Sequence, residues 1–182
     1  MRVPTTLAGC FLRPWRQDDK PALLHHANNR NVWRNLTELF PHPYTEADAD
    51  VWFSIASTPG SSLYLAIDVD GQAVGGIGVI AGHGISQYTG QFGYWLGESL
   101  WGRGIATAAA SALAAYALAQ PQFVRLEAPV FIWNLASMRV LEKAGFVREG
   151  VLRKSVFKDG QLIDSVLYAK VRDVSSSGEA LV

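Results

Sequence analysis

The residues best suited to chemistry lie in one short segment, 94–107, which reads YWLGESLWGRGIAT. Its apolar start is typical of a strand and its alanine-rich continuation of a helix, so a glycine-containing loop joins the two. Gly102 and Gly104 let an anion approach the backbone closely, and Arg103 adds a positive charge. Because the first turn of a helix has unpaired N–H groups, this pattern predicts a phosphate-binding loop. The alternative is a strand–helix turn that merely needs glycine.

The spacing excludes two better-known phosphate-binding loops. No Gly-Lys-Ser/Thr follows, so the segment is not a P-loop. The three-glycine spacing of dinucleotide-binding folds is absent, and Glu127 falls inside the next predicted strand. Metal chemistry is not indicated, because the only cysteine, Cys10, cannot build a thiolate site and the histidines lack metal-ligand spacing. We interpret the histidines as ordinary surface or partly buried residues: His25, His26, His42 and His83.

The segment resembles motif A of the GNAT superfamily of N-acetyltransferases. Trp101, Gly104 and Ala106 stand where that motif has Gln/Arg, Gly and Gly/Ala, and a Trp-Gly-x-Gly-x-Ala core is usual in the ribosomal-protein N-terminal acetyltransferase (RimJ/RimL-like) branch. Residues 134–137 and 141–146, which read NLAS and LEKAGF, resemble motif B of the same superfamily. Two motifs in this order are far more specific than either alone.

The resemblance covers about residues 11–172 and implies the activity. The family binds acetyl-CoA and transfers the acetyl group directly to a primary amine, without a covalent enzyme intermediate. The acceptor is either a protein N-terminus or a small-molecule amine. The alternative from another class is a non-catalytic module that senses acyl-CoA. A third interpretation is a protein-interaction domain that binds no cofactor.

The resemblance also implies roles for single residues. The N–H groups of residues 102–106 would hold the pyrophosphate of acetyl-CoA, and the N–H of Leu96 would face the thioester carbonyl. Asn134 would hydrogen-bond the pantetheine arm, unless it only caps a helix. Ser137 would protonate the departing thiolate, unless it is an ordinary helix-start serine. The predicted cofactor-binding residues are Leu96, Trp101, Gly102, Arg103, Gly104, Ile105, Ala106, Thr107, Asn134 and Ser137.

The general base is not supplied by the resemblance. Some RimL-like enzymes carry a carboxylate on the strand after motif B, where residues 153–157 read RKSVF. Glu127, beside the expected site, is the candidate base, with a structural hydrogen-bonding role as the alternative. Glu98 and bulk water are the other sources of a proton acceptor. The predicted catalytic residues are therefore Ser137, Glu127 and Leu96.

The elements that must position these residues alternate between strands and helices. Hairpins combined with crossover helices predict an α/β (α+β) fold of the GNAT type, with a mixed, mostly antiparallel and splayed sheet of about seven strands flanked by helices. The strands are expected at 11–15, 63–67, 73–80, 91–96, 124–131, 152–157 and 162–169. Helices are expected at 18–29, 45–56, 104–119 and 136–144. Trp33 lies in the N-terminal helical region, where this superfamily builds its acceptor site.

Length and composition set the remaining limits. The chain has 182 residues, 49% of them apolar, which predicts a single domain over residues 1–174 and a flexible tail at 175–182. Sixteen basic residues cancel sixteen acidic ones, so nothing indicates a nucleic-acid or membrane partner. We expect a cytoplasmic enzyme with acetyl-CoA as cosubstrate and no metal. The resemblance leaves the oligomeric state open, with a homodimer as one alternative.

Overall fold

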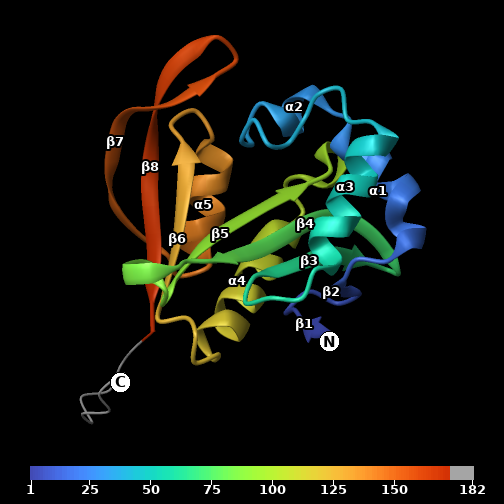
Figure 1. Ribbon diagram of the computed structural model, residues 1–182, viewed down its shortest axis with the longest axis horizontal. Coiled ribbons are helices and arrows are strands. Elements are labelled where there is room, and N and C mark those ends of the chain that lie inside the picture. The colour runs from blue at the N-terminus through green and yellow to red at the C-terminus, as the bar shows by residue number, and fades with distance from the viewer. Residues whose placement is uncertain (173–182) are drawn as a thin grey trace.

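A computed structural model describes residues 1–172, which form a twisted sheet with helices on both faces (Figure 1). The predicted tail and the predicted domain end at residue 174 lie outside these residues. The strands are β1 (Val3–Pro4), β2 (Cys10–Pro14), β3 (Leu63–Val69), β4 (Gln72–Ala81), β5 (Thr89–Leu96), β6 (Arg125–Phe131), β7 (Val147–Lys158) and β8 (Gln161–Val171). The helices are α1 (Lys20–Ala27), α2 (Arg30–Trp33), α3 (Glu46–Ser57), α4 (Ile105–Leu118) and α5 (Leu135–Lys143). Short 3-10 turns are η1 (Gln17–Asp19), η2 (Gly84–Ser86) and η3 (Glu98–Leu100).

The sheet runs in the order β1-β2-β3-β4-β5-β6-β8-β7. Among the strands of residues 1–172, only β5 and β6 pair in parallel, so the predicted mixed, mostly antiparallel sheet is confirmed. The expected number of strands was one too low, because β1 was not predicted. This two-residue strand pairs Val3 and Pro4 with Leu12 and Phe11, and it is too short to show a periodic pattern.

Each face of the sheet carries its own helices. The α4 and α5 side holds the main core, where Leu113 and Leu141 are fully buried against strand residues such as Phe92. The opposite side is covered by α1 and α3, which pack Leu23 and Phe53 beside Trp95. Across the described range 1–172, no helix is both long and apolar enough to cross a membrane.

The helix predicted at 18–29 is wrong in part. The stretch begins as the 3-10 turn η1, continues as α1, and breaks at Asn28. A further four-residue helix, α2, follows, because the side chain of Asn29 accepts hydrogen bonds from the N–H groups of Asn31 and Val32. Such a short helix depends on its cap rather than on a hydrophobic pattern, which is why the sequence did not reveal it.

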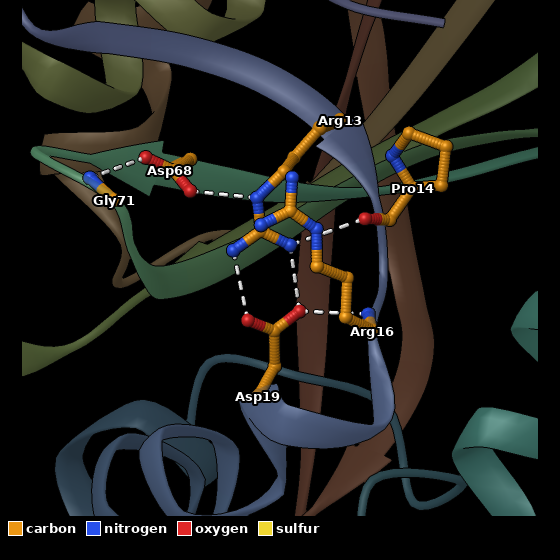
Figure 2. Close-up of polar contacts among 6 residues, drawn as sticks. All are labelled: Arg13, Pro14, Arg16, Asp19, Asp68 and Gly71. Atoms are coloured by element: carbon orange, nitrogen blue, oxygen red, sulfur yellow. Dashed lines mark hydrogen bonds and ion pairs between the residues drawn. The ribbon is translucent and has the colours of Figure 1, made fainter.

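A buried ion network joins the N-terminal elements (Figure 2). Arg13 donates from Nε to Asp68 (2.6 Å) and from Nη1 and Nη2 to Asp19 (2.6 and 2.8 Å). The carboxylates also accept the N–H groups of Gly71 and Arg16, both at 2.8 Å. All three side chains are buried, so this network fixes β2, the β3–β4 turn and the start of α1 to one another. Burial raises the pKa of Asp19, but hydrogen bonds from Arg13 and from the Arg16 N–H outweigh burial and hold that pKa below its usual range.

The parallel pair at the centre of the sheet is short. It joins residues 89–91 of β5 to residues 125–127 of β6 and then stops, although both strands continue. β6 remains paired with β8 as far as Phe131, so the separation opens between β5 and β6 only (Figure 1). We call this opening the split; it confirms the expected splay of the sheet.

Pro129 explains where the split begins. The N–H of Ile132 donates to Asp164 and that of Arg172 donates to the Val124 carbonyl. In an antiparallel ladder, the backbone N–H and C=O groups of every second residue point to the same partner strand. The even-numbered residues of β6 direct these groups to β8, so the odd-numbered residues, including residue 129, direct theirs toward β5. The next bond of the parallel ladder would run from the N–H of residue 129 to the carbonyl of Phe92. Proline has no N–H, so the ladder ends there.

Restoring that donor should extend the ladder. In Pro129→Ala, the new amide at position 129 is expected to donate to the Phe92 carbonyl and to exchange at least about tenfold more slowly than an unstructured amide. Hydrogen–deuterium exchange of the variant measures this directly. The matched control is Pro121→Ala in the exposed loop before β6, whose new amide should exchange freely. Free exchange at position 129 would mean that other contacts hold the split open.

Breaking the buried ion network should lower the free energy of unfolding. Arg13→Met leaves two buried carboxylates without their partner, and we expect a loss of about 3–5 kcal/mol in the free energy of unfolding. Urea denaturation gives the value. Lys20→Met, which removes a surface ion pair with Asp50, should cost less than about 1 kcal/mol.

The same network sets a dependence on pH. Because the folded pKa of Asp19 is lowered, its contribution to stability is complete above the unfolded pKa of about 3.9 and is lost as the pH falls through the folded pKa. The wild-type protein should lose this contribution on acidification.

Equal losses of stability in Arg13→Met and Lys20→Met at neutral pH would contradict the importance of the network.

Candidate acyl-transfer site

The end of β5 presents free backbone groups to the split. The N–H of Gly97 donates to the Val74 carbonyl of β4 at 2.9 Å. Because ladder bonds alternate, the N–H of Leu96 points away from β4 and toward the split, and the N–H of Tyr94 does the same two residues earlier. The Leu96 N–H, predicted to face a carbonyl, therefore lies at the open edge of the strand.

The backbone of the loop between β5 and α4 is open on one side and carries the partial positive charge of a helix start. Gly102 and Gly104 have φ of 75° and 78°, in the left-handed region that favours glycine. A Cβ at either position would meet nothing within 4 Å, so the space beside this backbone is empty of protein. Gly104 begins α4 without any side-chain cap. The first-turn N–H groups, including those of Ile105, Ala106 and Thr107, consequently have no helical partner.

The other predicted residues of motif A lie beside this open backbone. Trp101 is 44% exposed, and its indole N–H donates to the Leu96 carbonyl at 2.8 Å. Trp101 thus ties the loop to the end of β5, a role that the sequence did not show. Arg103 is exposed on the loop, and Thr107 is half-buried in the first turn of α4. The structure therefore brings the motif A residues together at one end of the split.

Asn134 and Ser137 lie on the other side of the split, after β6. The Asn134 carbonyl oxygen accepts the N–H of Ser137 at 3.1 Å and so caps α5. The helix-cap alternative for Asn134 is thus observed, while its amide N–H₂ makes no hydrogen bond within residues 1–172. Ser137 occupies the first turn of α5, with its hydroxyl turned back toward β5.

Tyr94 is the partner of that hydroxyl. Its phenol oxygen lies 2.8 Å from the Ser137 Oγ, and its O–H also reaches the Ser137 carbonyl at 3.2 Å. Burial raises the pKa of Tyr94 to about 12, despite the opposing effect of the hydrogen bond with Ser137, so the phenol keeps its proton at neutral pH. Sequence reasoning gave Tyr94 no role. The available signal was strand alternation, which puts Tyr94 on the same face as Leu96 and therefore toward α5.

The predicted carboxylates are held by other groups. Glu127 accepts from Arg125 Nε at 2.8 Å, and the same guanidinium pairs with Glu149 of β7. Glu127 also stands opposite Gln91, the last pair of the parallel ladder, at the closed end of the split. The structure therefore does not bring Glu127 into contact with the Tyr94–Ser137 pair.

Glu98, the other candidate acid, ties the loop after β5 to the helical region. It accepts hydrogen bonds from the side-chain amides of Asn29 (2.8 Å) and Asn31 (2.7 Å). On the β6 side, the guanidinium of Arg34 stacks over Trp133, with 5.3 Å between the Cζ atom and the ring centroid. The segment 29–34, which contains α2, therefore contacts the residues that follow both strands of the split.

The tip of the β7–β8 hairpin also contacts segment 29–34 (Figure 1). Asp159 at its tip pairs with Arg30 at 2.9 Å. The buried Lys158 ammonium lies 3.6 Å from the centroid of the Trp33 ring and 3.1 Å from the Glu38 carboxylate. These contacts fix α2 and Trp33 in place. Within residues 1–172, no group of three or more His, Cys, Asp or Glu side chains is arranged to hold a metal ion.

Comparison with solved structures places this geometry among known folds. The chain resembles Mycobacterium smegmatis RimJ in complex with CoA-disulfide, with a TM-score of 0.75 and 27% identity over 94% of this chain and 86% of that chain. It also shares its fold with RimL, the ribosomal L7/L12 alpha-N-protein acetyltransferase, solved in complex with coenzyme A. That match has a TM-score of 0.84 and 20% identity, covering 96% of this chain and 100% of that one.

Two curated relatives match part of the chain at higher identity. The probable N-acetyltransferase YjcK of Bacillus subtilis (strain 168) is 47% identical over 68 residues, which are 37% of this chain and 38% of that protein. The ribosomal-protein-serine acetyltransferase of Escherichia coli (strain K12) is 33% identical over 99 residues, 53% of this chain and 55% of that protein. The matches thus span about half or less of these two relatives. A family model described as an acetyltransferase (GNAT) domain matches residues 10–147, and the chain belongs to that family.

Proposed function

We propose that this protein is an acetyl-CoA-dependent N-acetyltransferase that transfers the acetyl group directly to a primary amine in a ternary complex. The observation that carries the proposal is the split, which begins at Pro129 and opens beside the uncapped start of α4. Free strand edges accept an extended chain with amide groups, and an uncapped helix start accepts a phosphate. Acetyl-CoA has both parts in one molecule.

The residues present fit this cosubstrate. The N–H groups of residues 102–106 would hold the pyrophosphate, in the space that a Cβ at Gly102 or Gly104 leaves open. Arg103 and the Thr107 hydroxyl would add a charge and a donor. Trp101 would support the site by holding the loop against Leu96. The free amide N–H₂ of Asn134 would donate to the pantetheine arm between the strands.

Acetyl-CoA supplies an activated thioester, and the chain supplies the groups around it. The N–H of Leu96 would donate to the carbonyl oxygen on which negative charge develops, an interaction that typically contributes about 10²–10³ in rate. The Ser137 hydroxyl would give a proton to the departing sulfur. Tyr94, at 2.8 Å, would orient that hydroxyl and replace its proton.

The acceptor is proposed only by class, as a protein N-terminus or a small-molecule amine. The relative in Escherichia coli is named for a ribosomal-protein serine, which supports a protein N-terminus as the first acceptor to try. The cytoplasmic location, the homodimer and the lack of nucleic-acid or membrane partners stay predictions of the sequence. An acyl-CoA sensor differs from the enzyme in one measurable way, because it binds acetyl-CoA without releasing thiol in the presence of any amine.

Binding of acetyl-CoA tests the phosphate site. Titration calorimetry should show binding to the wild-type protein, and Gly104→Trp should weaken it at least about tenfold, because the indole would fill the open space above the loop. Gly71→Trp is the matched control, since Gly71 also has a positive φ and open space but lies in the β3–β4 turn. No binding to the folded wild type at about 1 mM ligand would overturn the proposal.

Thiol release tests the transfer step. With acetyl-CoA and a panel of acceptors (hexapeptides with a free Ser, Ala, Thr or Met N-terminus, spermidine and kanamycin), the wild type should release CoA with at least one amine. Ser137→Ala should lower kcat about 10²-fold and leave the Kd for acetyl-CoA unchanged, because the hydroxyl acts only on the leaving sulfur. Tyr94→Phe should also lower kcat, by a smaller factor.

The control for these two variants is Ser57→Ala, a helical serine of α3 whose hydroxyl bonds a backbone carbonyl far from the split. It should behave as the wild type. Wild-type kcat in Ser137→Ala would remove Ser137 from the mechanism, whereas binding without thiol release for every amine would favour the sensor.

A further inference from the structure

A histidine lies against the end of β5, where the proposed reaction has no assigned base. A Cβ built on Gly97 would be 2.3 Å from Nδ1 of His26 and 3.1 Å from its Cε1. The imidazole of α1 therefore lies directly on the Gly97 backbone, one residue after Leu96. Glycine is needed at position 97 to admit the ring.

The ring lies on the face of β5 opposite the proposed acid. Along a strand, alternate residues point to opposite faces, so position 97 continues the face of Trp95, which packs with Phe40 under the N-terminal helices. Tyr94 and Leu96 point to the other face, toward α5, where Tyr94 meets Ser137. His26 and Ser137 thus approach the end of one strand from its two sides. An amine arriving on the α1 side would meet an imidazole, and the departing sulfur on the α5 side would meet a hydroxyl.

The surroundings hold the ring in place. Just after α1, the Asn28 side chain accepts the N–H of Tyr44 at 3.1 Å. Asn29 and Asn31 then bind the Glu98 carboxylate on the loop that begins at Gly97. The helix carrying His26 and the strand end beneath it are therefore tied together from both directions.

Burial, with a smaller effect of the neighbouring His25, keeps the His26 ring neutral at neutral pH. Burial lowers the pKa of His26, and the neighbouring His25 ring, 4.8 Å away between centroids, lowers it further. Neither β4 nor β5 contributes a charged residue. Of the other charged groups on adjoining elements, Lys20 is paired with Asp50, Arg30 with Asp159, and Glu98 is bound by Asn29 and Asn31. Within residues 1–172, neither ring nitrogen of His26 has a hydrogen-bond partner, so the ring is free to accept a proton.

We propose that His26 is the general base of the acetyl transfer, taking the proton of the acceptor ammonium directly or through one water molecule. The free amine then forms its N–C bond to the acetyl carbon as the C–S bond breaks and leaves its electron pair on sulfur. His26 passes this first proton to water before the attack, and its neutral ring then takes the second proton, which the nitrogen loses as the amide forms. The sulfur gains a proton from Ser137, whose hydroxyl is reprotonated by Tyr94, and Tyr94 is reprotonated by solvent. His26 finally returns the second proton to water. This assignment replaces the interpretation of His26 as an ordinary histidine, and it rests on the function proposed above.

The first measurement needs no cosubstrate and no enzymatic activity. The carbon-bound ring protons of His26 and His25 can be followed by NMR in the unliganded protein, with each signal assigned by its Gln variant. His26 should titrate below the ordinary value of 6.5. A pKa above 7 for His26 would overturn the inference, because the ring would then be protonated when the base is needed.

The second measurement is the pH profile of thiol release with the best acceptor of the panel. In the wild type, kcat/KM should rise with pH through the pKa of His26 and again through that of the amine. His26→Gln should lower kcat/KM about 10²-fold at neutral pH and lose the lower rise, with an unchanged Kd for acetyl-CoA. In His26→Ala, added imidazole should restore part of the rate in proportion to its neutral form.

The matched control is His25→Gln, the adjacent residue on the same helix, which should stay within about twofold of the wild type at neutral pH. Glu127→Gln tests the earlier candidate in parallel. A His26→Gln variant that binds acetyl-CoA and keeps the wild-type profile overturns the role of His26, as does loss of the lower rise in Glu127→Gln alone. If the wild type binds no acetyl-CoA or releases no thiol, the proposed transferase function itself fails.

Discussion

The missing N–H of Pro129 is the constraint on which the rest of this structure depends. It removes one donor from a parallel ladder at the point where β5 and β6 would otherwise continue side by side. Adjacent strands inside a sheet normally satisfy each other's backbone N–H and C=O groups. Beyond the split, such groups of β5 and β6 have no partner in the sheet. β6 stays rigid because its other edge is fully paired with β8. The opening is therefore a fixed feature of the fold rather than a frayed edge.

Everything placed around the split follows from the two strands that diverge there. A helix follows each strand along the chain: α4 after β5 and the loop that contains η3, and α5 after β6. The two helix starts differ in their capping. α4 has no side-chain cap and keeps its first-turn N–H groups free, whereas α5 is capped by Asn134. The free start suits an anion, and the capped start holds Ser137 against Tyr94. The segment 29–34 then joins the ends of both strands and limits how far they separate.

Much of this arrangement was readable from the sequence because it is local. Strand alternation and the glycines of motif A each predict structure within a few residues. The contacts that give side chains their chemical roles are not local. Tyr94 meets Ser137 across 43 positions, and Asn29 meets Glu98 across 69. Pro129 was visible within a predicted strand, yet its effect depends on which edge of β6 faces β5, and only the register with β8 decides that.

His26 illustrates the same limit more sharply. Two adjacent histidines on a short helix give no functional signal, because neighbouring positions on a helix point in different directions. Gly97 gives none either, since glycine after a strand is common. Only their contact shows that the glycine admits the imidazole and that the imidazole reaches the strand end. A strand can separate a proton acceptor from a proton donor in this way, because consecutive residues of a strand point to opposite faces. At the end of β5, one residue step therefore separates a surface that can take a proton from a surface that can give one.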